Sequence, residues 1–405
     1  MFRIVIIFLL TLPLTAQAFY QWQSDDSALE LRGLLRGTGL AINNANDELL
    51  FEKDKFLTAG GFGRLMIDAQ TTGMSIEAHA VQSVIDSELR TGGSRVSSVV
   101  AIDRSDAMQW SFANQHADLM IDRLNVQFSG ERFNIKLGRQ AINLAATYYF
   151  TPNDFYAPFA AQTFYRTYKP GVDAARLDWL WGELSQLSLY TVLTYQIDNI
   201  YSAKRQTSPD WSDTSVLARA STLLGDFEWA VLLGKEQGDN IIGVDFQGEL
   251  FEWLGVRGEG HLRFPDELDQ SRDIKFSLGL EHRFENTLTI RIEQFYQRSG
   301  ADNEQQYLLS RQAINTNSYY LAQNYTALGA SYEITPLLNS DAVWIYNHLD
   351  SSNLLALYGT YSLSDESELS MGLNLSVGEQ SHNGMLNSEF GSYPKSVTVE
   401  YRVYF

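Results

Sequence analysis

The most regular feature of the sequence is an alternation of apolar and polar residues along segments of about ten residues. The clearest example is the C-terminus, where Val397, Val399, Tyr401, Val403 and Phe405 alternate with Thr398, Glu400, Arg402 and Tyr404. Successive side chains of a β-strand point to opposite faces, so this pattern predicts a strand with one apolar and one polar face. The pattern recurs along most of the chain, and it predicts an all-β protein.

Eighteen strands are predicted from this alternation, and one missed or additional hairpin would change the number to sixteen or twenty. The predicted strands are 28–38, 58–70, 74–84, 117–129, 132–142, 171–180, 185–197, 213–223, 226–235, 240–249, 252–263, 273–283, 287–297, 326–335, 340–348, 353–362, 366–377 and 395–405.

The connections between these strands are sorted by length. Those after even-numbered strands are short, as at 71–73, 130–131, 284–286 and 364–365. Those after odd-numbered strands are often long, namely 39–57, 85–116, 143–170, 198–212, 298–325 and 378–394. A soluble sandwich would also have strands with two unlike faces, but it has no reason to sort its loops. Outer-membrane barrels have short periplasmic turns and long extracellular loops. The sequence therefore predicts a transmembrane antiparallel up-and-down β-barrel with an aqueous lumen.

The first eighteen residues have the features of a signal peptide. Arg3 is followed by the apolar run 4–14 and by the small-x-small site Ala16-Gln17-Ala18. The run is too short for the ~20 residues that a spanning helix needs. We therefore expect residues 1–18 to be removed and residues 19–405 to form a single barrel domain.

Composition and charge exclude several classes of protein. The mean hydropathy of −0.20 is too low for a helical membrane protein, and the absence of cysteine excludes disulfides and thiolate chemistry. The formal charge of −19 argues against a nucleic-acid partner. The six histidines are scattered and none lies in a nucleophile motif or a His-x-x-x-His spacing. We expect no enzyme activity, no cofactor and no metal site.

The connection 143–170 is unusually rich in aromatic residues, with nine among the twenty-one residues from Tyr148 to Tyr168. So much apolar area would not remain exposed to water, so the segment must pack against something. We expect it to fold into the lumen as a constriction; a lid over the mouth or a partner interface is the alternative. The constriction candidates are Tyr149, Asp154, Phe155, Tyr156, Arg166 and Lys169, with Asp154, Arg166 and Lys169 as a polar edge.

The polar rows of the strands are expected to face the lumen. Their basic residues are Arg32, Arg36, Arg64, Arg123, Lys136, Arg176, Arg219, Arg257, Arg263, Lys275, Arg283, Arg291 and Arg402. Their acidic residues are Glu30, Asp68, Glu77, Asp178, Glu228, Asp245, Glu249, Glu259, Glu281, Glu293 and Glu400. The two sets nearly balance, and opposite charges on neighbouring strands favour cross-strand pairs. The chosen pore-lining candidates are Arg32, Arg64, Arg123, Lys136, Arg257, Glu259, His261, Arg263, Lys275, Glu281, Arg283, Arg291 and Glu293. Among these, Arg257, Arg263, Arg283 and Arg291 could form a substrate-facing basic stripe.

The signal peptide, the alternating strands and the terminal Phe405 resemble those of Gram-negative outer-membrane porins. The resemblance implies that Tyr401, Val403 and Phe405 are read by the barrel-assembly machinery. A narrower resemblance, to alginate-export-like porins, rests on 137–140, 153–158 and 168–177. The export channel is similar to a strongly basic tube, and the balanced inward charges depart from that pattern.

The predicted function is a channel for small hydrophilic solutes across the outer membrane, with outer-membrane lipid and lipopolysaccharide as surroundings. Two alternatives stay open. One is a dedicated conduit, either for a polysaccharide or as a sheath around a periplasmic redox protein. The other is an adhesive or structural barrel that acts through its loops.

Overall fold

The computed structural model describes residues 20–51, 53–85, 102–112, 117–199, 204–266, 271–308 and 319–405. The predicted signal peptide lies outside the described residues. Within them the chain is almost entirely β-structure, with three short 3₁₀ segments, η2 (Asp106–Met108), η4 (Glu304–Gln306) and η5 (Phe390–Ser392). No helix among these residues is long and apolar enough to cross a membrane.

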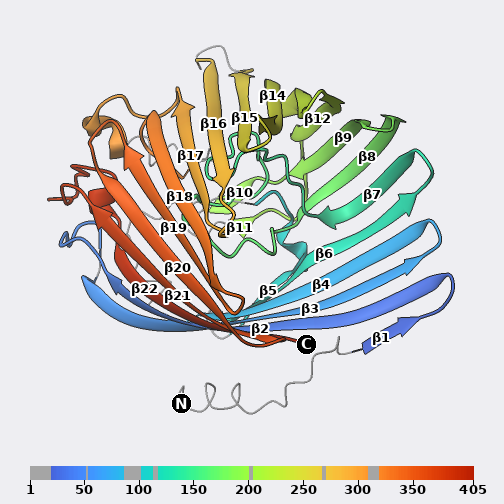
Figure 1. Cartoon of the computed structure of the whole chain (residues 1–405), viewed down its shortest axis with the longest axis horizontal. Helices are drawn as coiled ribbons and strands as arrows, with labels where there is room; N and C mark the ends of the chain where they lie inside the picture. The colour runs from blue at the N-terminus through green and yellow to red at the C-terminus, as the bar shows by residue number, and fades with distance from the viewer. Residues whose placement is uncertain are drawn as a thin grey trace.

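Eighteen strands of the described residues form one closed antiparallel ring, as predicted (Figure 1). They are β2 (Ser27–Asn43), β3 (Lys55–Thr71), β4 (Met74–Ile85), β6 (Ala117–Ser129), β7 (Phe133–Gln140), β8 (Val172–Gly182), β9 (Ser185–Thr194), β12 (Asp210–Leu224), β13 (Phe227–Glu236), β14 (Asp239–Leu250), β15 (Leu254–Phe264), β16 (Asp273–Arg283), β17 (Thr289–Gln297), β18 (Asn324–Thr335), β19 (Leu338–Asn347), β20 (Asn353–Ser364), β21 (Ser367–Val377) and β22 (Lys395–Tyr404). Four short strands lie beside the ring or in its loops: β1 (Tyr20–Gln23), β5 (Gln109–Phe112), β10 (Ile197–Asn199) and β11 (Lys204–Arg205).

The ring closes where the last strand pairs with the first. β22 runs antiparallel to β2, from the pair Leu34–Tyr404 to the pair Asn43–Lys395. Beyond this pairing, Gly33 and Phe405 exchange backbone hydrogen bonds of 2.5 and 3.0 Å. A Cβ on Gly33 would overlap the ring of Phe405, so only glycine lets the terminal aromatic side chain lie flat on β2. Closure matters because an open edge in lipid would leave backbone groups without partners.

The outer and inner faces of the ring differ as the alternation predicts. Outward residues on β13 to β16 are apolar and exposed, including Val231, Leu233, Val244, Leu262, Phe276 and Leu278. Inward residues on the same strands include the buried polar side chains Asp245, Glu259, His261, Lys275 and Ser277. An exposed apolar exterior around a polar interior is the arrangement of a barrel that lies in lipid.

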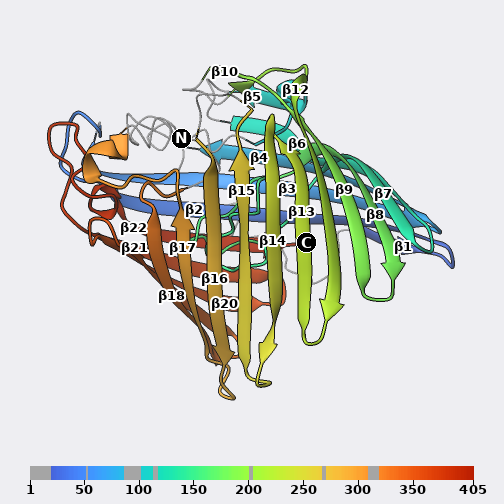
Figure 2. The same ribbon diagram turned by 90° about the horizontal axis from the view of Figure 1, so that it is seen from above.

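The short turns lie together at one end of the barrel. Those after β12, β14 and β16 are seen side by side in Figure 2. With the turns after β3, β6, β8, β18 and β20, they form a set of eight connections of two to five residues. The opposite end has the long connections 44–54, 141–171 and 378–394. The prediction that loop length alternates along the chain is confirmed for these segments.

Two local features depart from the predicted strands. β2 continues to Asn43, five residues beyond the predicted end, because the outward row becomes Gly37, Gly39 and Ala41 and the apolar signal fades. In β6, the pairing with β4 shifts between His79–Arg123 and Ala80–Ile121, which is a β-bulge. The bulge leaves both Asp122 and Arg123 buried, whereas strict alternation allows only one of two neighbours on the inner side.

Candidate functional site in the barrel lumen

The segment 141–171, which connects β7 to β8, lies inside the ring of strands (Figure 1). It has no regular secondary structure, so its backbone N–H groups need partners other than a strand ladder. Side chains on the inner face of the distant strands β15 and β17 supply these partners. Residues 102–108, the described part of the connection between β4 and β6, contact β6 and β7 through Arg104 and Ser105.

Two carboxylates on the inner faces of β15 and β17, which are separated by β16, hold the start of this segment. Glu259 on β15 accepts hydrogen bonds from the backbone N–H groups of Ala146, Thr147 (2.9 Å) and Asn153 (2.9 Å).

Glu293 on β17 does the same for Tyr148 (2.6 Å), Tyr149 (2.8 Å) and Phe150 (3.0 Å). Five consecutive N–H groups, from residue 146 to residue 150, are therefore bound by two buried carboxylates. Hydrogen bonds to an ionised acceptor are about twice as strong as neutral ones, so the backbone of the segment is fixed against this wall.

Aromatic side chains of the segment fill two apolar clusters against the wall. Phe150 stacks on Phe295 of β17, with ring centroids 5.0 Å apart, and contacts Tyr320 edge-on. Tyr149 is buried in the same cluster. Phe155 and Tyr156 are buried in a second cluster with residues of β8, β9, β12, β13 and β14, among them Val172, Tyr190, Val192 and Leu217. The aromatic content that singled out this segment in the sequence is thus accounted for by burial.

The expected polar edge of the segment is wrong for two of its three residues. Asp154 and Lys169 form a buried ion pair with each other, so neither side chain is presented to solvent. Burial raises the pKa of the Asp154 carboxyl and lowers that of the Lys169 ammonium, although their mutual attraction opposes both shifts.

Arg166 is half-buried and donates hydrogen bonds to the carbonyl oxygens of Tyr148 (2.5 Å) and Thr163 (2.7 Å). These groups stabilise the fold of the segment, because a buried charge is tolerated only when it is paired.

A network of charged residues holds the point where the segment joins β7 and β8. The buried Arg139 side chain binds both carboxylate oxygens of Asp173, at 2.7 and 3.0 Å, and the carbonyl oxygens of Ile121 and Ser105. A Cβ on Gly171 would overlap the carbonyl oxygen of Asp122, so this close approach requires glycine. The motif residues Arg139, Gly171 and Asp173 therefore have a structural explanation in this protein.

The opposite wall of the lumen, formed by β2, β3 and β4, is open. A cavity of about 500 Å³ lies there, and Arg36, Arg64, Ser83, Tyr165 and Tyr168 are among its lining residues. A second cavity of about 300 Å³ lies along the same strands toward the short-turn end and includes Arg32, Asp68 and Glu77. The two hollows follow one wall from the middle of the barrel toward one end. They define a candidate passage for solutes.

Arginine side chains contact aromatic rings at and beside the larger cavity. The Arg64 guanidinium lies 4.5 Å from the ring centroid of Tyr168, and that of Arg402 lies 4.5 Å from Tyr165. Arg36 lies 4.9 Å from Phe62 and 5.7 Å from Tyr165. Cation–π contacts of this kind orient the guanidinium groups without neutralising their charge.

The predicted basic stripe is largely paired with acids. Arg263 pairs with Glu236 and with Asp239 at 3.1 Å. Arg291 pairs with Glu281, which is also 3.6 Å from Arg257. Only Arg283, exposed at the short-turn end of β16, has no ion pair among the described residues.

The remaining pore-lining candidates divide between the two walls. On the open wall, Arg32 pairs with Asp68 at 2.6 Å and Lys136 with Glu77 at 3.0 Å. Beneath the segment 141–171, the ring of His261 is 3.1 Å from the side-chain oxygen of Asn153. Lys275 is buried, 4.0 Å from Asp273, and Arg123 donates to the carbonyl oxygen of Lys169. His261, Lys275 and Arg123 are therefore buried groups rather than open surface of the passage.

Several residues of the site were not among the chosen candidates. Asp122 receives Arg64 at 2.8 Å and Arg104 at 3.1 Å, and its inward position depends on the bulge in β6. The alternation predicts that Arg36 faces the lumen, but nothing in the sequence shows which wall is covered. Tyr165 and Tyr168 belong to the aromatic segment, and only the fold shows that they face the open wall.

A buried carboxyl also fixes the connection 378–394, at the end of the barrel that has the long connections. Glu389, in the connection 378–394, accepts hydrogen bonds from the Tyr325 hydroxyl, the Leu321 N–H (3.1 Å) and the Asn347 amide (2.9 Å). Its own N–H donates to the carboxylate of Asp350 at 2.7 Å, which also accepts from the Tyr307 hydroxyl. Burial raises the pKa of the Glu389 carboxyl to about 8.

Solved structures of outer-membrane porins have the same fold. An OccK9 (OpdG) structure from Pseudomonas aeruginosa is 10% identical, with a TM-score of 0.61 over 93% of this chain and 98% of that one. A BenF-like porin from Pseudomonas fluorescens is 12% identical, with a TM-score of 0.59 over 93% and 99%. OccAB1 of Acinetobacter baumannii is 10% identical, with a TM-score of 0.58 over 93% and 96%. No protein-family model matches the chain, and no curated protein matches it either.

Removing the two carboxylates that bind the inner segment should widen the passage. We expect a Glu259→Ala/Glu293→Ala double variant to form a barrel with a larger and noisier single-channel conductance, because six backbone N–H groups lose their acceptors. Each such charged hydrogen bond contributes ~1.5–3 kcal/mol. Planar-bilayer recording checks the result. Glu228→Ala removes another inward carboxylate, one that pairs with Arg219 instead, and should leave the conductance unchanged. Equal conductance in the double variant and the wild type would contradict the holding role.

The rim connection 378–394 should loosen as the pH rises. The raised pKa of Glu389 means that docking is strongest below the ordinary value of about 4.5, where the carboxyl is protonated in both states. Docking should weaken from there to about pH 8, since only the undocked carboxyl ionises in that range. Hydrogen exchange of these residues, corrected for intrinsic rates, should increase by at least about tenfold between pH 5 and 8. Glu389→Gln should abolish the dependence, and Glu379→Gln, at an exposed position of the same connection, should preserve it.

Proposed function

We propose that this protein is an outer-membrane channel through which small hydrophilic solutes pass. The observation that carries the proposal is the one-sided lumen: the segment 141–171 is bound to one wall, and cavities of about 500 and 300 Å³, both with charged residues in their lining, follow the other. A barrel of eighteen strands is wide enough to hold an aqueous channel. The fold shared with the Occ and BenF-like porins supports the same conclusion.

The proposed route has a local surplus of positive charge. Arg36, Arg64 and Arg104 line the larger cavity, and the acids there are Asp122 and Glu400. Arg64 and Arg104 share Asp122, while Arg36 is 3.9 Å from Glu400. A ring of one sign favours ions of the other sign, so we infer a modest preference for anions although the whole chain is acidic.

The proposed location requires export and assembly, which the two ends of the chain would direct. Residues 1–18 would be removed after export. Tyr401, Val403 and Phe405 would be read by the barrel-assembly machinery, and the seat of Phe405 on Gly33 is where that signal would finish closing the ring.

A bulky side chain on the open wall should block the passage. Ser83 is on the inner row of β4 and lines the larger cavity. We expect Ser83→Trp to lower the single-channel conductance by at least about half, because an indole would occupy a large part of a 500 Å³ space. Gln82→Trp is the matched control, since Gln82 is the exposed neighbour on the other face of the same strand. An unchanged conductance in Ser83→Trp would place the route elsewhere, and an absence of current in the wild type would refute the channel itself.

Ion preference should depend more on Arg36 than on Arg263. A unit charge about 7 Å from an ion in water contributes ~0.6 kcal/mol, with opposite sign for a cation and an anion, so Arg36→Gln should raise the cation-to-anion permeability ratio up to about sevenfold. Arg263→Gln should change it less, because Arg263 is already bound by Glu236 and Asp239. Reversal potentials in a salt gradient measure both ratios. A larger effect from Arg263 would restore the predicted basic stripe on β15 to β17.

A further inference from the structure

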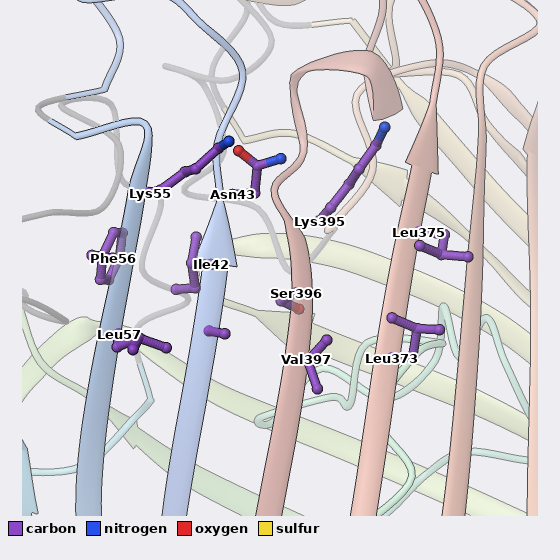
Figure 3. A pocket seen from close by; sticks show the side chains of 11 residues that line it. Ile42, Asn43, Lys55, Phe56, Leu57, Leu373, Leu375, Lys395, Ser396 and Val397 are labelled. Carbon is purple, nitrogen blue, oxygen red and sulfur yellow. The ribbon is translucent and has the colours of Figure 1, made fainter.

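An apolar groove lies on the outer face of the barrel at the seam where the ring closes. It crosses the ends of β3, β2, β22 and β21 on the side of the long connections, and its cavity volume is about 550 Å³ (Figure 3). Its floor and sides include Ala41, Leu57, Val397, Leu373 and Leu375. These residues belong to the outward rows of their strands, so the groove faces the surroundings of the barrel and is separate from the solute passage.

The shape of the groove follows from unequal side-chain sizes along neighbouring strands. Outward residues of β2 below the cavity are Gly39 and Gly37, and a Cβ on either would meet nothing within 4 Å. On one side, Leu57 of β3 is 77% exposed; on the other, Met371 of β21 is 57% exposed. Large apolar side chains therefore border a low strip about one strand wide, a shape that suits a linear hydrocarbon chain.

Two lysines stand at the loop end of this groove. Asn43 of β2 pairs in register with Lys55 of β3 on one side and with Lys395 of β22 on the other. The three polar side chains form a single row above Leu57 and Val397 (Figure 3), and Ala41 pairs in register with both. All three are exposed, and neither ammonium group has an acidic partner within 4.0 Å in the described part of the chain. Two uncompensated positive charges above an apolar strip match an amphiphile with an anionic head.

We propose that this groove binds a phosphorylated acyl lipid of the outer leaflet, with a phosphate between Lys55 and Lys395 and an acyl chain along Ala41 and Gly39. The proposal rests on the proposed function, which places the long connections outside the cell and this end of the barrel in the outer leaflet. Lysines near an anionic membrane surface each contribute about 1 kcal/mol to binding. The amide of Asn43, between them, can donate a further hydrogen bond to the head group.

A second copy of the chain fits the same face less well. Self-association through the groove would bury two ammonium groups, and an unpaired buried charge costs several kcal/mol. The described outward residues of these four strands above Leu373 offer no carboxylate to compensate them. Phosphate compensates both charges at once, so charge complementarity favours the lipid.

The test measures lipid binding to the refolded full barrel in detergent by native mass spectrometry. The probes are hexa-acylated lipid A and the same lipid after removal of its phosphates. The wild type should prefer the phosphorylated form, and Lys55→Gln/Lys395→Gln should weaken its binding by about thirtyfold, roughly fivefold for each lysine. Lys235→Gln is the matched control, because Lys235 is an exposed lysine on the outward row at the same end of β13. It should bind like the wild type.

A shape variant tests the apolar part. Ala41→Trp fills the groove without touching the lysines, and it should weaken binding of both lipids. The proposal is overturned if the wild type does not distinguish the two lipids, if the double lysine variant binds like the wild type, or if Ala41→Trp has no effect. It is also overturned if the spectra show a dimer that Ala41→Trp dissociates and that excludes lipid.

Conductance of the same samples separates this inference from the channel. Current without selective lipid binding refutes the lipid site and leaves the proposed function intact. Selective lipid binding without current refutes the channel and leaves the site.

Discussion

The capture of five consecutive backbone N–H groups by Glu259 and Glu293 determines the shape of the lumen. A segment that leaves the sheet and enters a wide barrel loses its ladder partners, and water in the lumen would compete for every amide. Carboxylates are suited to this task because each has two oxygens and about four lone-pair sites. Placed on alternate strands of one wall, they bind the chain at neighbouring points and give it one position.

The consequence of this capture is asymmetry. The aromatic side chains from Tyr149 to Tyr156 pack against β17 and against β8, β9 and β12 to β14, so this part of the lumen is filled. Tyr165 and Tyr168 of the same segment face the larger cavity along β2 to β4, which stays open. The arginines of the covered wall are compensated by acids such as Glu236 and Glu281. Those of the open wall contact tyrosine rings, which hold them in place, and they share fewer acids, since Arg64 and Arg104 both bind Asp122. A nearly neutral inner surface thus becomes a passage with a locally positive side.

The strands could be predicted from the sequence because the alternation of apolar and polar residues is a local property that is visible within each strand. The ends of strands were predicted less well where the alternation weakens. An example is β2, whose outward Gly39 and Ala41 have little hydrophobic signal. The inner rows were also predictable by parity, except at the bulge in β6, where Asp122 turns inward beside Arg123. The position of a residue in the alternation predicts which face of the sheet its side chain is on. It does not predict which part of that face another segment covers.

The candidate site was predictable in composition and less so in arrangement. The high aromatic content of 143–170 predicts that a large apolar area of this segment must be buried. It does not predict which residues bury it. Whether Asp154 and Lys169 formed an edge or a buried pair depends on the path of the fourteen residues between them, which no local pattern specifies. Glu259 and Glu293 were expected as lumen-facing acids, yet their partners are amides more than 100 positions away.

The seam of the ring shows how one local choice of residue can serve several demands. Gly33 on β2 lets the ring of Phe405 lie against the strand, and the small outward residues Gly37, Gly39 and Ala41 leave a hollow bordered by Leu57 and Met371. Bulky residues at these positions would cover the seam with side chains and remove the hollow. Glycine in a strand costs stability through backbone entropy, so glycine on the outward row calls for a reason in what approaches the strand. Among the described residues Phe405 approaches at Gly33, whereas the space over Gly37 and Gly39 stays open, and an acyl chain in that space would supply the reason there.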